Sequence, residues 1–186
     1  MEDFLGVYDN VLGKEDCEII IDWFESSADL QEIGKSAVGI NKKVKDSTDI
    51  ACVMNSNIPI SKWIHKALHL SFKDYVKRYK ILDNIEKFAL DPGYNVQRYY
   101  PNQGYFREHC ENAGGPHKDS KRVLAWTLYL NDVTDGGGTR YTLLNKTVDA
   151  VEGRLVLFPA YWTHAHHGIV SPTQTKYIAT GWFASL

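Results

Sequence analysis

The second half of the chain is a succession of short apolar or alternating runs, separated by stretches rich in Gly, Pro, Asn and Asp. Nine such runs follow Lys87: FAL, YNVQRYY, GYFREHC, RVLAWTLYL, GTRYTLL, TVDAV, RLVLFP, WTHAHHGIV and KYIATGWF. Alternation with a period of two predicts strands, and the turn residues between them favour antiparallel pairing. We therefore predict a mainly β fold, a jelly roll or a barrel, rather than a parallel α/β sheet.

The first half of the chain has helical periodicity in two places. Residues 14–27 and 61–79 carry apolar side chains at the 3.6-residue spacing of an amphipathic helix. Residues 4–8 have the character of a short strand, whereas residues 27–57 are polar and irregular. We expect the two helices to pack on the β core.

The length of the chain predicts how these parts combine. A chain of 186 residues is of the size that builds one hydrophobic core. We predict a single domain over residues 1–186, with an N-terminal helical layer (1–86) packed on one sheet of a β core (87–186).

Charge and cysteine content argue against several classes of protein. The formal net charge is −2, which provides no electrostatic footprint for nucleic acid. The densest basic run, Lys42 to Lys45, is followed by Asp46 and Asp49 and is typical of a solvated loop. Three irregularly spaced cysteines favour a reducing compartment. With no leader pattern and no apolar run of membrane-spanning length, we expect a cytoplasmic protein, and nothing indicates its oligomeric state.

Histidines in the β half are the candidate chemical groups. On a strand, alternate side chains share a face, so His109 and Glu111 are expected to point together. His164 and His166 share a face by the same rule. A hairpin turning near Ser171 would pair His166 with Lys176. Continued alternation puts Lys176, Ile178, Thr180 and Trp182 on that same face.

Two histidines and one carboxylate with open positions are the ligand set of a non-haem ferrous site. His109, Glu111 and His166 provide this set and leave room for a bidentate 2-oxo acid and dioxygen. Lys176 is then a candidate partner for the far carboxylate of such a co-substrate. A competing pair, His117 and Asp119, is also His-x-Asp, but it follows the loop NAGGP, which does not hold both side chains on one face.

Zinc is the competing metal, since histidine, glutamate and cysteine all bind it. Structural zinc sites are closed by four protein ligands, commonly with paired cysteines, and no Cys-x-x-Cys occurs in this chain. Cys110 is expected to be a small buried residue rather than a ligand.

From Tyr94 to Phe183 the sequence resembles the prolyl-4-hydroxylase-like Fe(II)/2-oxoglutarate-dependent dioxygenase family. The resemblance rests on Tyr100 and on four further stretches: QGYFREHCE, RVLAWTLYLNDVTDGGGT, GRLVLFPAYWTHAHHG and KYIATGWF. It implies a mainly β, double-stranded β-helix (jelly roll, cupin-like) core with N-terminal helices packed on one sheet. It also implies an enzyme that needs Fe(II), 2-oxoglutarate and O2, with ascorbate as an optional reductant. It also implies hydroxylation of a peptide or small-molecule substrate, such as a peptidyl proline, with release of succinate and CO2.

Carried over by position, the resemblance makes His109, Glu111 and His166 the iron ligands. The other implied roles concern the two substrates: Lys176 grips the far carboxylate of 2-oxoglutarate, Tyr100 and Thr139 hydrogen-bond the co-substrate, Trp182 walls the pocket, and Arg122 lies near the substrate entrance. The chain departs from the family pattern at Glu111, where most members have Asp, and at Gly138, where GGET is typical. The first departure keeps Asp119 open as the carboxylate ligand.

Two other functions remain as alternatives at this level. The first is a non-enzymatic, cupin-like β domain that binds a metal or a sugar, and the second is a zinc-dependent hydrolase. A carboxylate anchor beside the metal distinguishes the oxygenase from both. Variable segments, residues 27–57 and 113–116, are candidates for substrate selection, but neither names a substrate.

Overall fold

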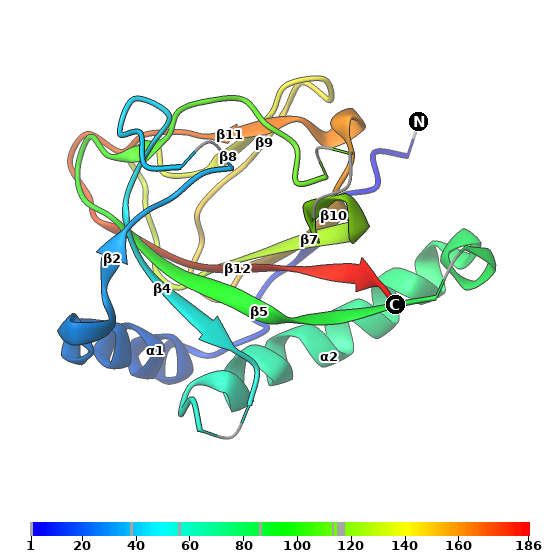
Figure 1. Cartoon of the computed structure of the whole chain (residues 1–186), viewed down its shortest axis with the longest axis horizontal. Helices are drawn as coiled ribbons and strands as arrows, with labels where there is room; N and C mark the ends of the chain where they lie inside the picture. Colours follow the sequence, from blue (N-terminus) through cyan, green and yellow to red (C-terminus); the bar gives the residue numbers. More distant parts are fainter. Residues whose placement is uncertain (1, 38, 56, 86, 113, 115–117) are drawn as a thin grey trace.

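In the computed structural model, two helices lie against one face of a large sheet, and a smaller sheet covers the other face (Figure 1). The structure describes residues 2–37, 39–55, 57–85, 87–112, 114 and 118–186. The helices are α1 (Lys14–Ser26) and α2 (Ser61–Arg78). The strands are β1 (Gly6–Tyr8), β2 (Glu32–Ile33), β3 (Lys45–Asp46), β4 (Thr48–Val53), β5 (Phe88–Tyr99), β6 (Gly104–Tyr105), β7 (Arg122–Tyr129), β8 (Thr139–Tyr141), β9 (Lys146–Val148), β10 (Leu155–Pro159), β11 (His166–Gly168) and β12 (Lys176–Ser185).

The large sheet has seven antiparallel strands in the order β1-β10-β7-β12-β5-β4-β2. Opposite it lies a three-stranded sheet, β11-β8-β9, and a two-stranded ribbon pairs β3 with β6. Consecutive strands β10, β11 and β12 alternate between the two sheets, which is the chain path of a jelly roll. The predicted fold class is therefore confirmed.

Strand alternation divides the large sheet into two faces. On β7, Leu124, Trp126 and Leu128 point toward the helices and join the larger core cluster. Ala125 and Tyr129, which alternate with these residues along the strand, point toward the small sheet and join a second cluster. The period of two thus builds two apolar layers from one strand, and the polar cavity described below lies on the small-sheet side.

The helices bury one stripe each, as the periodicity predicted. Cys17, Ile20 and Phe24 of α1 are fully buried against the sheet, and Ile64 and Leu68 of α2 lie in the same cluster. Residues Ser26 and Arg78 end the two helices, one position before the predicted ends. Within the described residues, neither helix is long and apolar enough to cross a bilayer.

The predicted division into a helical layer (1–86) and a β core (87–186) is wrong in detail. β1 pairs with β10, and β4 pairs with β5 over six residues, so the first 86 residues build part of the large sheet. β4 escaped detection because its cavity face is polar: Asp49 lies among buried residues there, while Ile50 and Cys52 face the helices. Residues 27–57 are therefore not irregular.

The predicted hairpin between His166 and Lys176 is also wrong. β11 pairs with β8, with His166 opposite Tyr141, and β12 pairs with β5, with Lys176 opposite Tyr99. A jelly roll sends consecutive strands to opposite sheets, so the two residues meet across the sandwich and not along a hairpin. Both still line one cavity.

Candidate metal centre and active site

Three side chains from distant parts of the chain converge inside the sandwich. One ligand atom from each of His109, Glu111 and His166 lies within 4.8 Å of the other two, and no other such group of three occurs among the described residues. His109 and His166 are joined by two backbone hydrogen bonds of 3.0 and 2.9 Å, which hold the first ligand segment against β11. The two histidines that the sequence placed 57 positions apart therefore stand side by side.

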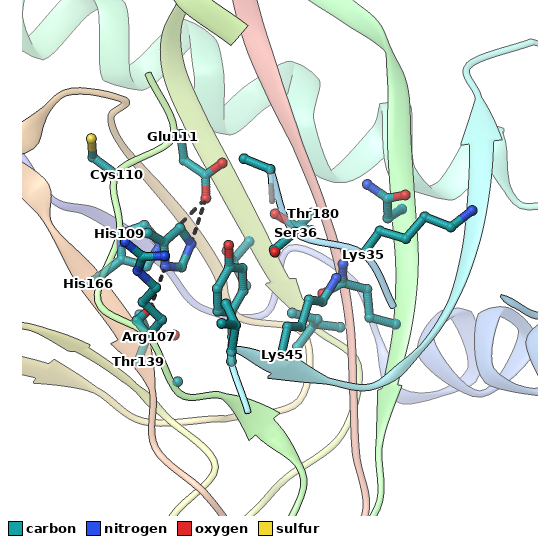
Figure 2. Close-up of a pocket in the computed structure, with 18 of the residues that line it drawn as sticks. Lys35, Ser36, Lys45, Arg107, His109, Cys110, Glu111, Thr139, His166 and Thr180 are labelled. Atoms are coloured by element: carbon teal, nitrogen blue, oxygen red, sulfur yellow. Dashed lines mark hydrogen bonds and ion pairs between the residues drawn. The ribbon is translucent and has the colours of Figure 1, made fainter. Parts of the chain in front are cut away.

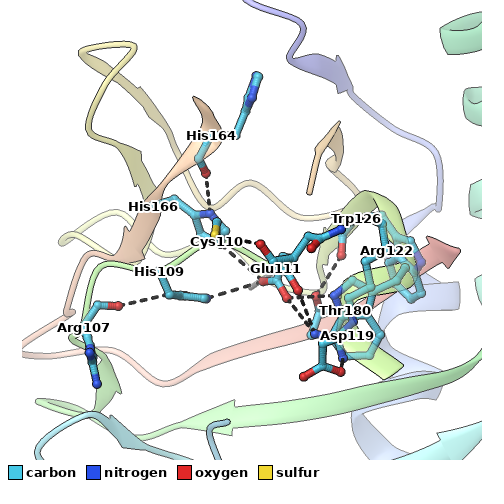
Figure 3. Close-up of polar contacts among 12 residues, drawn as sticks. Arg107, His109, Cys110, Glu111, Asp119, Arg122, Trp126, His164, His166 and Thr180 are labelled. Atoms are coloured by element: carbon cyan, nitrogen blue, oxygen red, sulfur yellow. Dashed lines mark hydrogen bonds and ion pairs between the residues drawn. The ribbon is translucent and has the colours of Figure 1, made fainter. Parts of the chain in front are cut away.

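Each imidazole is oriented by a backbone carbonyl. The Nδ1 of His109 donates to the carbonyl of Arg107 at 3.0 Å, and the Nδ1 of His166 donates to the carbonyl of His164 at 2.9 Å (Figure 3). Both Nε2 atoms are therefore turned toward Glu111 Oε1, at 3.4 and 3.5 Å. A carbonyl behind each ring is the usual arrangement that fixes the tautomer of a metal-binding histidine.

The Glu111 carboxylate is held by its second oxygen. Trp182 Nε1 donates to Oε2 at 2.8 Å, and Arg122 Nη1 lies 3.6 Å from the same atom. Burial opposes ionisation of Glu111, but the hydrogen bonds and charges of the two histidines outweigh burial and lower the pKa of the carboxyl well below its usual range. One charged oxygen thus points at the two imidazoles while the other is anchored.

Lys176 is a buried cation that no carboxylate neutralises among the described residues. Its exposed fraction is 6 %. Its Nζ donates to the carbonyl of Gly137 at 2.9 Å and lies 4.7 Å from the centroid of the Tyr99 ring. Burial alone lowers the pKa of this ammonium to about 8. Gly168 lies beside the ammonium, since a Cβ at that position would stand 3.7 Å from Nζ, an ordinary contact distance. An anionic ligand would supply the missing partner.

A cavity of about 540 Å³ connects the three ligands to Lys176. Thr139, Ile178, Thr180 and Trp182 line it, as strand alternation predicted for the β12 residues. Figure 2 shows Thr180, Ser36 and Lys45 across the cavity from the histidines, while Cys110 points away from them. Cys110 donates to the carbonyl of Asn112 at 3.2 Å, in keeping with a partly buried residue outside the ligand set.

The predicted Tyr100 does not line the cavity, whereas Tyr99 and Tyr105 do. Tyr100 has an exposed fraction of 48 % and stacks under the guanidinium of Arg98, whereas Tyr99 is buried and lines the cavity. The prediction counted back from His109 along the sequence, but the side chain that faces inward is set by the pairing of Tyr99 with Lys176 on β12. One residue of slip exchanges the two faces of a strand.

Thr139, which the resemblance makes a hydrogen-bond partner of the co-substrate, lines the cavity. Its Oγ1 is 2.6 Å from the hydroxyl of Tyr129, a buried residue that sequence reasoning overlooked. Tyr129 belongs to the apolar run RVLAWTLYL, where nothing distinguishes a tyrosine that serves a site from one that fills the core. Only the opposed sheet reveals its position.

Arg122 and Trp182 form one wall at the metal end of the cavity. The Arg122 guanidinium lies 3.6 Å from the centroid of the Trp182 ring, and its Nη1 donates to the Glu111 carbonyl at 3.1 Å. Arg122 also pairs with Asp119 at 2.9 Å. The alternative ligand Asp119 is therefore paired with this guanidinium, outside the group of three, and its proposed companion His117 lies outside the described residues.

His164 does not share a face with His166, contrary to the strand prediction. It ends a short 3-10 turn, Trp162–His164, and its Nε2 donates to the carbonyl of Asp3 at 2.9 Å. β11 begins only at His166. The backbone carbonyl of His164, and not its ring, contributes to the metal centre, because it orients the imidazole of His166 (Figure 3).

A comparison with protein families identifies the chemistry that this geometry serves. Residues 94–184, about half of the chain, match the model of the 2OG-Fe(II) oxygenase superfamily. This stretch contains His109, Glu111, His166 and Lys176. The chain belongs to this superfamily. The oxygenase is thus an enzyme that takes Fe(II), 2-oxoglutarate and O2, and neither a zinc hydrolase nor a simple binding module. No curated protein sequence matches the chain.

Solved structures similar to the oxygenase are prolyl hydroxylases. The viral collagen prolyl hydroxylase of Paramecium bursaria Chlorella virus 1, solved with 2OG, has a TM-score of 0.73 and 20 % identity, covering 98 % of this chain and 97 % of that chain. The Pseudomonas putida prolyl-4-hydroxylase has a TM-score of 0.71 and 17 % identity, covering 97 % of this chain and 92 % of that chain. A Trichoplax adhaerens prolyl hydroxylase, bound to a hypoxia-inducible factor peptide, has a TM-score of 0.74 and 20 % identity, covering 98 % of this chain and 84 % of that chain. These likenesses establish the jelly-roll fold along nearly the whole chain.

The residues present fit the superfamily's cofactors. Two imidazole nitrogens and one carboxylate oxygen, all facing one point, are the donors that a ferrous ion prefers, and three protein ligands leave coordination positions free. Lys176 supplies the unneutralised ammonium that a dicarboxylic co-substrate requires. A glutamate replaces the commoner aspartate without loss of this geometry, because Trp182 holds its outer oxygen.

Proposed function

We propose that the oxygenase hydroxylates a carbon of a peptidyl side chain such as proline. The observation that carries the proposal is the pairing, in one cavity, of the His109–Glu111–His166 group with the buried ammonium of Lys176. The first fits a ferrous ion, and the second fits the far carboxylate of 2-oxoglutarate. The iron with 2-oxoglutarate and O2 supplies the oxidising chemistry, in which the oxo acid becomes succinate and CO2 and the substrate gains a hydroxyl group.

The residues of the chain have three tasks in this proposal. Lys176 pairs with the far carboxylate and orients the co-substrate toward the ligand group. Trp182 and the two backbone carbonyls hold Glu111 and the imidazoles, so that little rearrangement accompanies binding. The enclosing sheets keep bulk water away from the reacting atoms.

A peptide is the substrate that the cavity favours. Arg107, Glu108 and Arg122 also line the cavity, and these charged residues are suited to a polar chain. The Trp182 and Tyr105 rings offer flat apolar surfaces beside it, of the kind on which a proline ring packs. The Trichoplax relative of similar fold was solved with a peptide bound. We also propose a reducing, cytoplasmic setting, in keeping with three free cysteines.

Anaerobic titration tests the class of the enzyme. Adding Fe(II) and then 2-oxoglutarate should produce the weak visible charge-transfer band of the chelate. His166→Ala should abolish the band. His164→Ala is the matched control: it keeps the backbone carbonyl that orients His166, so the band should persist. Absence of the band in the unaltered protein would refute the class.

Succinate release against peptides tests the substrate. Proline-containing peptides should raise succinate formation above the level without peptide, and mass spectrometry should find an added oxygen atom on the proline residue. Stimulation only by peptides without proline, or only by small molecules, would contradict the proline proposal while leaving the enzyme class intact.

A further inference from the structure

A buried ion pair lies across the cavity from the metal group, in the part of the chain that the family model does not cover. Lys45 Nζ contacts Asp49 Oδ2 at 2.5 Å, and the two residues have exposed fractions of 4 and 9 %. Lys45 is therefore not part of a solvated loop, as its basic run suggested. Ser47 Oγ donates to Asp49 Oδ1 at 2.7 Å, and Gly34 packs so closely that a Cβ there would meet the Ser47 hydroxyl at 2.0 Å.

One side of this pair leads to the first metal ligand. β3, which carries Lys45, pairs with β6, and Lys45 stands opposite Tyr105. The ammonium lies 5.8 Å from the Tyr105 ring, and that ring stacks on His109 with centroids 3.8 Å apart and an interplanar angle of 11°. The Val44 carbonyl also accepts from the backbone N–H of Arg107, whose own carbonyl orients the His109 ring.

The other side of the pair leads to the co-substrate anchor. Gln97 Nε2 donates to Asp49 Oδ2 at 3.2 Å, and the Gln97 Oε1 accepts from the Tyr99 hydroxyl at 2.8 Å. The Tyr99 hydroxyl is thereby turned away from Lys176, so the ring presents its face to the ammonium. Asp49 therefore takes part in both series of contacts, through Lys45 toward His109 and through Gln97 toward Lys176.

Stability alone is a weak reason for such a pair. Replacing a buried ion pair by uncharged side chains of similar volume is often neutral or stabilising, because two charges must be desolvated to form it. An ion pair does hold its partners in one relative orientation, and here one partner belongs to the β3–β6 ribbon and the other to the large sheet.

We infer that Lys45 and Asp49 are positioning residues that set His109 through Tyr105 and Lys176 through Gln97 and Tyr99. The inference rests on the proposed function, because it takes His109 as a metal ligand and Lys176 as the co-substrate anchor. Metal affinity and 2-oxoglutarate affinity then both depend on two residues of the N-terminal strands, outside residues 94–184.

The test replaces both charges at once, so that no buried charge is left alone. In Lys45→Met/Asp49→Asn, Co(II) affinity, read from its visible absorption, should fall at least tenfold. The affinity of the Fe(II) protein for 2-oxoglutarate, read anaerobically from the charge-transfer band, should fall by a similar factor. The matched control is Glu25→Gln/Arg98→Met, which removes an ion pair on the opposite face of β5 and should change neither affinity more than twofold.

Variants of Tyr105 test the route to His109 without touching the ion pair. Tyr105→Leu removes the stacked ring and should weaken Co(II) binding severalfold, whereas Tyr105→Phe keeps the ring and should restore it. If the double variant does not fold, as judged by circular dichroism, Co(II) binding by Tyr105→Leu and Tyr105→Phe still tests whether Tyr105 positions His109. Unaltered Co(II) and 2-oxoglutarate affinities in a folded double variant, or in Tyr105→Leu, would overturn the inference. Failure of the unaltered protein to bind either ligand would overturn the proposed function and this inference together.

Discussion

At the scale of single residues, the site depends on polar side chains whose outer atoms are already held by the protein. Both imidazoles use Nδ1 for a backbone carbonyl and direct Nε2 toward Glu111 Oε1, Glu111 uses Oε2 for Trp182, and Lys176 has a carbonyl and a ring face but no anion among the described residues. Each group is therefore prepared for a ligand before it arrives, which reduces the cost of reorganisation on binding.

Removal of the Lys176 ammonium should weaken the co-substrate far more than the metal. Lys176→Ala leaves a buried carboxylate unpaired, which costs about 3 to 5 kcal/mol, or roughly a hundredfold or more in 2-oxoglutarate affinity. Co(II) affinity in the absence of 2-oxoglutarate should stay within about twofold, because Lys176 is not a ligand. Equal 2-oxoglutarate affinity in the variant, measured by titration, would contradict the assignment.

The pH dependence of 2-oxoglutarate binding follows from the same residue. Burial lowers the pKa of Lys176 to about 8 in the free protein, and a bound carboxylate raises it again. Below pH 8 the ammonium is already charged and affinity should be level. Above pH 8 binding must take up a proton, so affinity should fall, by at most about tenfold per pH unit. Calorimetry in two buffers of different ionisation enthalpy should detect that proton uptake. An affinity for 2-oxoglutarate that does not change up to pH 9.5 would contradict the proposed role of Lys176.

The Trp182 indole has a role separate from its bulk. Trp182→Phe keeps an aromatic wall but removes the N–H that holds Glu111 Oε2. Loss of such an outer partner typically costs about 10-fold to 100-fold in metal affinity. Co(II) titration should show a loss in this range, and an unchanged affinity would mean that Arg122 alone orients the carboxylate.

At the scale of elements, each strand of the large sheet serves two layers. The helix-facing residues of β7 and β12 give the sheet its stability, and the residues between them line the cavity. Mutations on the two faces should therefore have separable effects, since packing density on one side does not set the orientation of polar groups on the other.

Helix α2 provides the measurement of that separation. Ile64 is fully buried against the sheet, and Ile64→Ala should lower the free energy of unfolding by about 2 to 5 kcal/mol. Leu70→Ala on the exposed side of the same helix, where 72 % of the residue is exposed, should change it by about 0.5 kcal/mol or less. Urea denaturation measures both. Co(II) affinity should be unchanged in each, and a parallel loss of affinity in Ile64→Ala would show that the two faces are coupled.

At the scale of the whole molecule, the ligands close contacts between segments that are distant along the chain. The metal group joins the segment after β6 to β11, and the co-substrate joins both to β12. Ligand binding should therefore stabilise the entire fold and not one loop, because the unfolded chain has no such site.

Thermal unfolding with ligands measures this linkage. Metal and 2-oxoglutarate at a hundred times their dissociation constants should each add about 2.7 kcal/mol, which for a chain of this length corresponds to roughly 5 to 10 °C in Tm. A chelator should reverse the shift. His166→Ala should show no shift on adding metal, and a shift that persists in this variant would place the metal elsewhere.

Several features of the oxygenase were already determined by the sequence alone. The two-residue period after Lys87 specified antiparallel strands, and the helical period specified both buried helix faces. The sequence also selected His109, Glu111, His166 and Lys176 as candidates for one site, and all four line one cavity. These features are local, or repeat at a fixed spacing, so neighbouring residues are sufficient to reveal them.

Other features were decided only by the tertiary structure. Which of Tyr99 and Tyr100 faces the cavity depends on pairing with β12, and His166 meets Lys176 across two sheets instead of along a hairpin. The Lys45–Asp49 pair had the sequence pattern of a solvated loop until packing buried it. Register and burial are set by partners distant in the chain, and a one-residue change of register reverses every side chain of a strand.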